Sequence, residues 1–380
     1  MTNRLVLLLT MLAVLSGCGG RAVTGLQAGV SSEKTAAVVP IFLATNRARS
    51  DNPALPYSAE RSQALNFAEF DVGIPGNHTP GRVETSSRVP DPARQFAAVD
   101  YRPIEDRRRF VAALNAALAK RAPADREIFI FVHGYNNNIA ESLFRNAQIT
   151  HDYGINSVSL HYAWPSGGAI PLYVFDRDSV IVGRRGLAET IELAAQTNAT
   201  NVVLVGHSMG AYVVMEALRD LALSGGQRYL RRLGGVVLAA PDIDIDAFQS
   251  QADDIGKLPQ PFTIIVSRRD RALGFSRRIA GGHPRVGSGA DIALLQSRGI
   301  TVLDVSELDG GTHSVFASSQ TLMKLIDNSR LMRATLDDEK ASTEPSALAA
   351  SAAAVEGATS LTLFLPARLI GRMATAAPTQ

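Results

Sequence analysis

The stretch Val202–Leu218, VVLVGHSMGAYVVMEAL, places Ser208 in the pattern Gly-x-Ser-x-Gly. The pentapeptide alone is a weak signal, because glycine and serine are common residues in this chain. Its surroundings strengthen it, since Val202–Val205 is wholly apolar, as in a strand buried on both faces of a parallel sheet. Met209–Leu223 then carries apolar residues at helical spacing. A strand, a sharp turn and a helix make Ser208 a candidate nucleophile, exposed at the carboxyl edge of a sheet above a helix amino terminus.

The two glycines of the pattern, Gly206 and Gly210, also fit such a turn. The turn holds the backbone of the serine in a strained conformation, and side chains at the glycine positions would collide with the neighbouring strand and helix. The stretch therefore predicts the strand-turn-helix arrangement known as a nucleophile elbow.

Short runs rich in β-branched and aromatic residues recur along the chain and predict strands. They are Val39–Ala44, Phe67–Ile74, Ile128–Val132, Ser157–Tyr162, Val202–Val205, Gly235–Ala240, Phe262–Val266 and Ile300–Val305. Between the later runs, helical periodicity marks Ala140–Tyr153, Val180–Gln196 and Met209–Leu223. Strands that alternate with helices indicate parallel βαβ units, so we predict an α/β fold. The first two strands precede any long helix and can pair antiparallel.

The amino-terminal residues have the pattern of a secretion signal: an arginine, an apolar run over Leu5–Leu15 and then small residues. The run is too short for a membrane span, which needs about 20 apolar residues. Leu15–Cys18 resembles the lipobox of bacterial lipoproteins, which implies removal of residues 1–17 and acylation of Cys18, with palmitate for example. Gly19 after the cysteine implies the outer membrane, facing the periplasm, if the cell has two membranes. A plain cleaved signal with a leftover cysteine remains the alternative.

The rest of the chain divides by composition. Residues 18–37 are small and polar and are expected to form a tether, residues 38–335 the folded domain, and residues 336–380 an unstructured tail rich in alanine and serine. Cys18 is the only cysteine, which excludes disulfides and cysteine metal sites. A net charge of +2 without a long basic run gives no support to a nucleic-acid partner. No metal-ligand cluster, phosphate loop or dinucleotide fingerprint appears, so we expect no cofactor.

A serine hydroxyl needs a histidine base, and the base needs an acid that holds its tautomer. In doubly wound serine hydrolases the order is nucleophile, acid, histidine, which leaves His283 and His313. His313 fits better, because it follows the predicted strand Ile300–Val305 at the carboxyl edge. Asp270 is the favoured acid, since it follows the strand Phe262–Val266 at the same edge. Asp242, after the preceding strand, remains the alternative.

The oxyanion of an acyl-transfer intermediate needs two N–H donors. Met209, directly after the serine, supplies one amide, and Tyr135, in FVHGYNNN after an earlier strand, is expected to supply the other. His133 and His207 are then expected to be structural. The segment Trp164–Val182 precedes the elbow and is expected to form a lid or pocket wall.

Two side chains of this segment, Trp164 and Tyr173, are candidates for lining a pocket for an acyl or aryl group. An equally good interpretation is that they form the ordinary core of the lid.

Four short motifs together resemble the α/β-hydrolase superfamily, and within it a bacterial branch of uncharacterised, often lipoprotein, members. They are Thr45–Arg47 (TNR), His133–Asn136 (HGYN), Trp164–Ser166 (WPS) and Gly206–Gly210 (GHSMG). The resemblance covers roughly residues 38–331. It implies an eight-stranded, mostly parallel sheet with helices on both faces, and the triad Ser208, Asp270 and His313. It implies no substrate.

The sequence therefore leads us to expect a serine hydrolase that cleaves small-molecule or lipid carboxylic esters outside the cytoplasm, anchored to a membrane through Cys18. Amide or thioester hydrolysis with the same triad is the enzymatic alternative, since selectivity depends on pocket shape. A protein of another class, a non-catalytic envelope binding protein on the same fold, would be indicated by a site in which the triad members lie apart.

Overall fold

The computed structural model describes residues 22, 25–27, 29–327 and 361–366. The strands are β1 (Thr35–Arg49), β2 (Tyr57–Pro75), β3 (Ala97–Ile104), β4 (Ile128–Val132), β5 (Val158–Ala163), β6 (Val202–His207), β7 (Leu233–Ala239), β8 (Phe262–Val266), β9 (Thr301–Asp304) and β10 (Thr362–Phe364). The α-helices are α2 (Arg107–Ala119), α3 (Ile139–Asp152), α4 (Tyr173–Ala195), α5 (Met209–Leu223), α6 (Gln227–Leu230), α7 (Ile245–Ile255), α8 (Arg271–Ile279), α9 (Ile292–Ser297), α10 (Val315–Ser318) and α11 (Gln320–Asp327). Short 3₁₀ turns are η1 (Ser32–Lys34), η2 (Pro123–Asp125), η3 (Ile170–Leu172) and η4 (Val286–Ser288).

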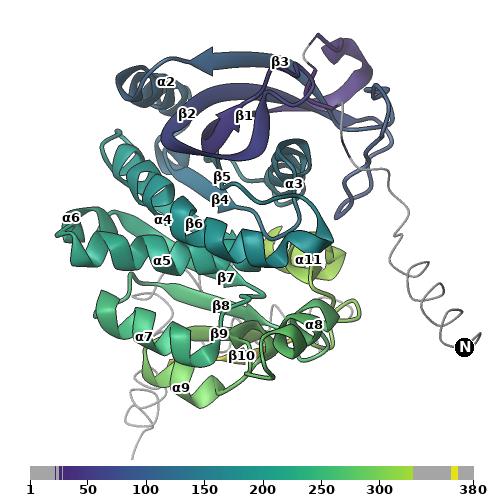
Figure 1. The fold of residues 1–380 in the computed structure, drawn as a ribbon. Helices are drawn as coiled ribbons and strands as arrows, with labels where there is room; N and C mark the ends of the chain where they lie inside the picture. Colours follow the sequence, from purple (N-terminus) through teal and green to yellow (C-terminus); the bar gives the residue numbers. More distant parts are fainter. Residues whose placement is uncertain (1–21, 23–24, 28, 328–360, 367–380) are drawn as a thin grey trace, which may run out of the picture.

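All the strands belong to one sheet, with the order β10-β9-β8-β7-β6-β4-β5-β1-β2-β3 (Figure 1). The strands from β1 to β9 along this order pair in parallel. β1 and β2 pair antiparallel, as the sequence suggested for the first two strands. Val132 at the end of β4 lies opposite Gly206 near the end of β6, so the loops that follow these two strands emerge side by side at the carboxyl edge. This register brings the elbow together with the loop that begins at His133 and Gly134, here called the His-Gly loop.

The sheet has ten strands, so the expected count of eight is wrong. β3 pairs antiparallel with β2 at one edge of the sheet, and β10 pairs antiparallel with β9 at the other. β3 is half exposed and carries Asp100, Arg102 and Pro103, a composition that edge strands tolerate and central strands do not. β10 lies in the segment expected to be an unstructured tail, and that expectation is wrong for Thr362–Phe364.

Both faces of the sheet are buried, which explains the wholly apolar central strands. Ile128, Ile130 and Val132 pack in one cluster with side chains of α2, α4, α5 and α7. Phe129 and Phe131 point to the opposite face and pack with α3, α10 and α11. The alternation of β4 between two helical layers thus confirms helices on both faces.

The folded body begins earlier than the expected boundary at residue 38. Ala22 and Leu26 are buried in the cluster that contains α3 and β1. The Asn138 Nδ2 donates to the Ala22 carbonyl at 3.1 Å, and the Ala98 N–H donates to the Gly25 carbonyl at 3.0 Å. The expectation of a free tether is therefore wrong from Ala22 onward among the described residues, because its small side chains fit between the sheet edge and α3.

The expected signal peptide and the acylated Cys18 lie outside the described residues. Within the described ranges, the helices are all too short or too polar to cross a bilayer.

Candidate active site

Ser208 occupies a sharp turn between β6 and α5, with φ 55° and ψ −122°. A positive φ is strained for a residue with a side chain and persists only where the surroundings impose it. A side-chain carbon added at Gly206 would lie 2.8 Å from the Ala211 Cα, and one at Gly210 would lie 2.3 Å from the His133 carbonyl oxygen. The Ser208 N–H donates to the Ala239 carbonyl at 2.9 Å, which fixes the turn against β7. The stretch forms the predicted strand-turn-helix elbow.

Asp270 and His313 form a direct pair at the same edge of the sheet. The His313 Nδ1 lies 2.6 Å from the Asp270 Oδ2, and the Asp270 carboxylate is fully buried. Because a carboxylate only accepts, Nδ1 carries the proton and Nε2 is left with a free lone pair. The His207 Nε2 donates to the His313 carbonyl at 3.1 Å and holds the backbone of that residue. The contact with Asp270 therefore sets the tautomer of His313 and leaves its Nε2 without a proton.

Ser208 and His313 line one cavity of about 760 Å³. Within the part of the chain that the structure describes, the Ser208 Oγ forms no hydrogen bond of 3.5 Å or less. In unliganded hydrolases such contacts are often long and close on the substrate. His283, the other histidine in the expected chain order, is exposed in the loop after α8 and does not line this cavity.

Asp242, the alternative acid, faces the same cavity but has other partners. It accepts from the Ser276 Oγ at 2.5 Å and from the Tyr173 hydroxyl at 3.1 Å, and the Arg285 Nε lies 3.3 Å away. Arg285 is only 1% exposed, so this carboxylate balances a buried charge. The structure brings Asp270, and not Asp242, to His313.

The two amides expected to bind an oxyanion belong to the elbow and to the loop after β4. Met209 is the first residue of α5, where a helix leaves the N–H without an intrahelical acceptor. Tyr135 lies in the loop after β4, and among the described residues its N–H has no acceptor. A side-chain carbon on Gly134 would lie 3.0 Å from the Ser208 Cβ, so glycine lets this loop approach the serine.

Trp164 packs under the loop after β4, against His133, and does not line the cavity. The expectation that it forms a pocket wall is therefore wrong. Its side chain is fully buried, and its indole stacks on the His133 ring with centroids 5.2 Å apart. The Trp164 Nε1 donates to the His133 carbonyl at 2.7 Å. Burial lowers the pKa of His133 well below its usual value, so this imidazole is neutral and structural. Trp164 belongs to the core because its N–H has a partner there.

Three further residues hold the same loop, and sequence reasoning gave none of them a role. The Arg47 Nη2 donates to the Asn137 carbonyl at 2.9 Å. The Asp176 carboxylate accepts from the Ser166 Oγ at 2.5 Å and from the Gly167 N–H at 2.6 Å, and burial raises its pKa. Arg47 and Ser166 belong to the TNR and WPS motifs, which was the available signal. Asp176 gave no sequence signal, because its partners lie in separate turns.

Tyr173 lines the cavity, together with a group of apolar residues on η3 and α8. The Tyr173 hydroxyl contacts the Ser276 Oγ at 2.8 Å, which ties the start of α4 to α8 above Ser208. The apolar residues of the lining include Ile170, Leu273 and Phe275. α8 follows Asp270 directly. The sequence argument that placed Asp270 at the carboxyl edge could therefore also have placed α8 beside the cavity.

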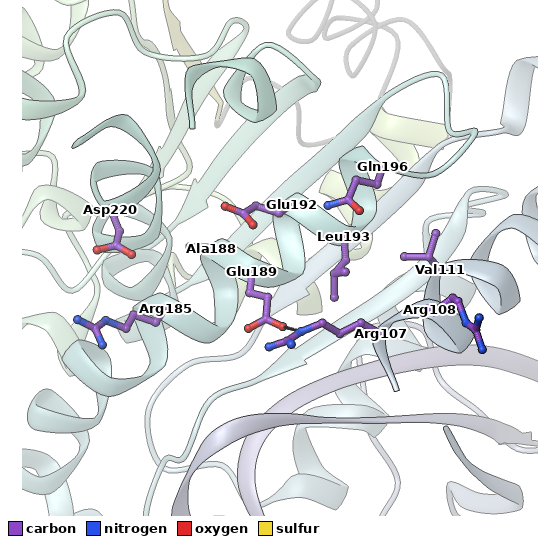
Figure 2. A pocket seen from close by; sticks show the side chains of 10 residues that line it. All are labelled: Arg107, Arg108, Val111, Arg185, Ala188, Glu189, Glu192, Leu193, Gln196 and Asp220. Atoms are coloured by element: carbon purple, nitrogen blue, oxygen red, sulfur yellow. Dashed lines mark hydrogen bonds and ion pairs between the residues drawn. The ribbon is translucent and has the colours of Figure 1, made fainter. Parts of the chain in front are cut away.

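A second groove, of about 660 Å³, lies between α2 and α4 (Figure 2). Arg107 and Glu189 form an ion pair across it, and the candidate residues described above do not line it. Arg107 lies at the exposed start of α2. Among the described residues, no three histidine, cysteine, aspartate or glutamate side chains cluster as a metal site would require.

Comparisons with solved structures find matches at low identity and low TM-score. Lipase B from Aspergillus fumigatus is 15% identical over 56% of this chain and 55% of that chain, with a TM-score of 0.35. A fungal esterase from Rhizomucor miehei is 11% identical over 78% of this chain and 82% of that chain, with a TM-score of 0.36. Carboxyl esterase 2 from Tuber melanosporum is 13% identical over 80% and 87%, with a TM-score of 0.33. Curated proteins give no match in sequence.

A family model described as "Alpha/beta hydrolase of unknown function (DUF900)" matches residues 108–330, more than half of the chain. The match extends from α2 to the end of the described part of α11 and contains the elbow, the Asp270–His313 pair and the His-Gly loop. The chain therefore belongs to this family of α/β-hydrolases.

Proposed function

We propose that this α/β-hydrolase is a serine esterase, which cleaves carboxylic esters through an acyl-serine intermediate. The observation that carries the proposal is that Ser208 and His313 line the same cavity at the carboxyl edge, and that His313 is paired with Asp270. In this scheme Ser208 is the nucleophile, His313 is the base and Asp270 orients the imidazole. The buried position of Asp270 keeps its carboxylate directed at His313 rather than at solvent.

In the first half-reaction the Ser208 Oγ attacks the ester carbonyl carbon and His313 Nε2 takes the hydroxyl proton. The carbonyl π electrons move to oxygen, and the Met209 and Tyr135 amides stabilise the oxyanion. When the tetrahedral intermediate collapses, the C–O bond to the alcohol breaks and the imidazolium protonates the leaving oxygen.

In the second half-reaction a water molecule takes the place of the alcohol. His313 accepts a proton from the water as it attacks the acyl-serine, and returns the proton to the Ser208 Oγ as the carboxylic acid leaves. The imidazolium that forms twice in the cycle lies against the buried Asp270 carboxylate, which favours the charged ring.

The apolar wall formed by Ile170, Leu273 and Phe275 suits an acyl or aryl group of the substrate. An amide or a thioester could use the same groups, so substrate comparison has to separate the three bond types.

The test is labelling of the purified protein with a fluorophosphonate, a probe that reacts only with activated serines. We expect wild type to be labelled and Ser208→Ala to be unlabelled, with Ser297→Ala as a matched control because that exposed serine lies on α9. Butyrate esters, thioesters and anilides of matched size then rank the bond types by kcat/KM. If wild type with a normal circular dichroism spectrum is not labelled, the chain is a binding protein on a hydrolase fold.

We also propose that the enzyme acts outside the cytoplasm, tethered through an acylated Cys18, on small-molecule or lipid esters. The support is the apolar run and lipobox-like residues at the amino terminus of the sequence. The test is metabolic labelling with an alkynyl palmitate, followed by membrane fractionation. Label on wild type that disappears with Cys18→Ser supports the anchor, and a secreted unlabelled chain contradicts it.

A further inference from the structure

Exposed apolar side chains gather on the elements that border the active-site cavity, and two of them, Ile170 and Phe275, line it. Nine large apolar side chains are strongly exposed in the described part of the chain, and five of them lie on η3, the start of α4 and α8. These five, here called the mouth rim, are Ile170 (47% exposed), Leu172 (40%), Val174 (72%), Phe275 (56%) and Ile279 (49%). η3 and α8 are neighbours, because the Tyr173 hydroxyl contacts the Ser276 Oγ at 2.8 Å. Large exposed apolar side chains gathered on neighbouring elements are typical of an interaction site.

Uncompensated positive charge accompanies the mouth rim. Arg271, Arg277 and Arg278 are exposed on α8, among Phe275 and Ile279. Within the described residues, no carboxylate oxygen lies within 4.0 Å of these three guanidinium groups. One exposed acid, Asp178, lies on the adjoining turn of α4, so the face retains a net positive charge. Arginines interleaved with apolar side chains are typical of helices that lie in the interface of an anionic membrane.

The amino-terminal segment reaches the body of the protein at the same edge. The Ala22 carbonyl accepts from the Asn138 Nδ2, and Asn138 caps α3 one residue after Asn137, which lines the cavity. Ala22 is four positions after Cys18 in the sequence, so Cys18 lies within about 14 Å of this point even in a fully extended chain. An acyl group on Cys18 would hold the carboxyl edge of the sheet, with the mouth rim, toward the bilayer.

We infer that the mouth rim docks on an anionic lipid bilayer, with Phe275 and its apolar neighbours in the interface and the α8 arginines at the headgroups. The cavity then opens toward the membrane, and substrates reach Ser208 from the lipid side. The contact is separate from the acyl anchor and from the hydrolytic reaction, so it can be measured without either.

The experiment uses residues 18–380 with Cys18→Ser and Ser208→Ala, which removes the acyl anchor and turnover. Residues 18–380 include every residue that the structure describes. Co-sedimentation is measured with vesicles of phosphatidylcholine alone and of phosphatidylcholine with 30% phosphatidylglycerol, the latter chosen at about the anionic content that attracts basic surfaces. We expect binding to the anionic vesicles that weakens as salt is raised.

Val174→Ser combined with Phe275→Ser is expected to weaken vesicle binding about tenfold, since two exposed apolar side chains no longer enter the interface. The matched control is Leu223→Ser, because Leu223 is 63% exposed at the far end of α5. It should leave vesicle binding unchanged. Equal binding by the double variant, or no binding by the parent chain, overturns the proposal. So does a stable dimer that the double variant converts to monomer, because the mouth rim would then be a contact between two copies.

Discussion

The two carboxylate oxygens of Asp270 have different partners: one caps helix α8, and the other contacts His313. Oδ1 accepts from the Leu273 N–H at 3.0 Å and caps α8, while Oδ2 lies 2.6 Å from the His313 Nδ1. The start of α8 therefore fixes the carboxylate before any substrate is present. This arrangement links the capping of a short helix to the tautomer of the candidate base.

Asp270→Asn should separate catalysis from folding. An amide can still cap α8 with its oxygen, but its NH₂ group then faces His313 and favours the wrong tautomer. We expect kcat/KM for a butyrate ester to fall about a thousandfold or more, with a small change in melting temperature. Steady-state kinetics and a thermal melt check both parts. An enzyme that keeps most of its activity would show that another acid serves His313.

Asp242→Asn should have the opposite profile. Its carboxylate lies 3.3 Å from the Nε of the buried Arg285, and the substitution leaves that guanidinium without a counter-charge. Removing one partner of a buried pair costs about 3 kcal/mol or more. We expect that loss in the free energy of unfolding, measured by urea denaturation, with Asp270→Asn as the reference. If Asp242→Asn is as stable as wild type but inactive, Asp242 has the role assigned to Asp270.

Trp164→Phe should affect the reaction through the His-Gly loop, which carries the proposed oxyanion donor Tyr135. Phenylalanine keeps an aromatic ring against His133 but removes the donor that lies 2.7 Å from the His133 carbonyl. That carbonyl also touches Gly210 of the elbow, so its displacement moves the loop relative to Ser208. We expect kcat to fall about tenfold while KM changes little, because the oxyanion donors act mainly in the transition state. A rise in KM with unchanged kcat would instead assign Trp164 to the pocket wall.

The central part of the fold and the candidate triad follow from local sequence rules. A short, wholly apolar run such as Val202–Val205 is typical of a strand covered on both faces, and the parallel pairing of the strands sets which residues reach the carboxyl edge. Ser208, Asp270 and His313 each follow such a strand, so their shared location is predictable without distances.

The remaining features depend on contacts that no local pattern encodes. β3 carries a proline and charged residues, which an edge strand tolerates and a central strand does not. β10 is a short strand inside a segment rich in alanine and serine. Trp164 is apolar enough for a pocket or a core, and only the His133 carbonyl next to its N–H decides between them. Asp176 joins two loops that are distant in sequence from the elbow, so its role appears only once the chain is folded.

His161 on β5 is buried, and its ring lies against the rings of Phe131 and His133. Neither ring nitrogen has a hydrogen-bond partner among the described residues, and burial together with the charge of Arg47 lowers its pKa to about 3. In the unfolded chain the same imidazole has a pKa of about 6.5. Between these two values the unfolded state binds a proton that the folded state does not, so the free energy of unfolding falls as the pH falls below about 6.5.

Burial also lowers the pKa values of His133 and His207, in the same direction as that of His161. The pKa of His78, held between Asp152 and Glu84, is raised, so its stabilisation is complete at acid pH and is lost as the pH rises through its folded pKa. His161→Phe removes one of the acid-sensitive groups and keeps an aromatic ring in the core. We expect it to reduce the loss of stability between pH 6.5 and about pH 4.5 by about 2 kcal/mol, measured by urea denaturation at each pH. His283→Phe, at an exposed loop position, is the control and should leave the pH dependence of wild type intact. A variant at position 161 with the wild-type slope would mean that this imidazole takes up its proton in the folded protein as readily as in the unfolded chain.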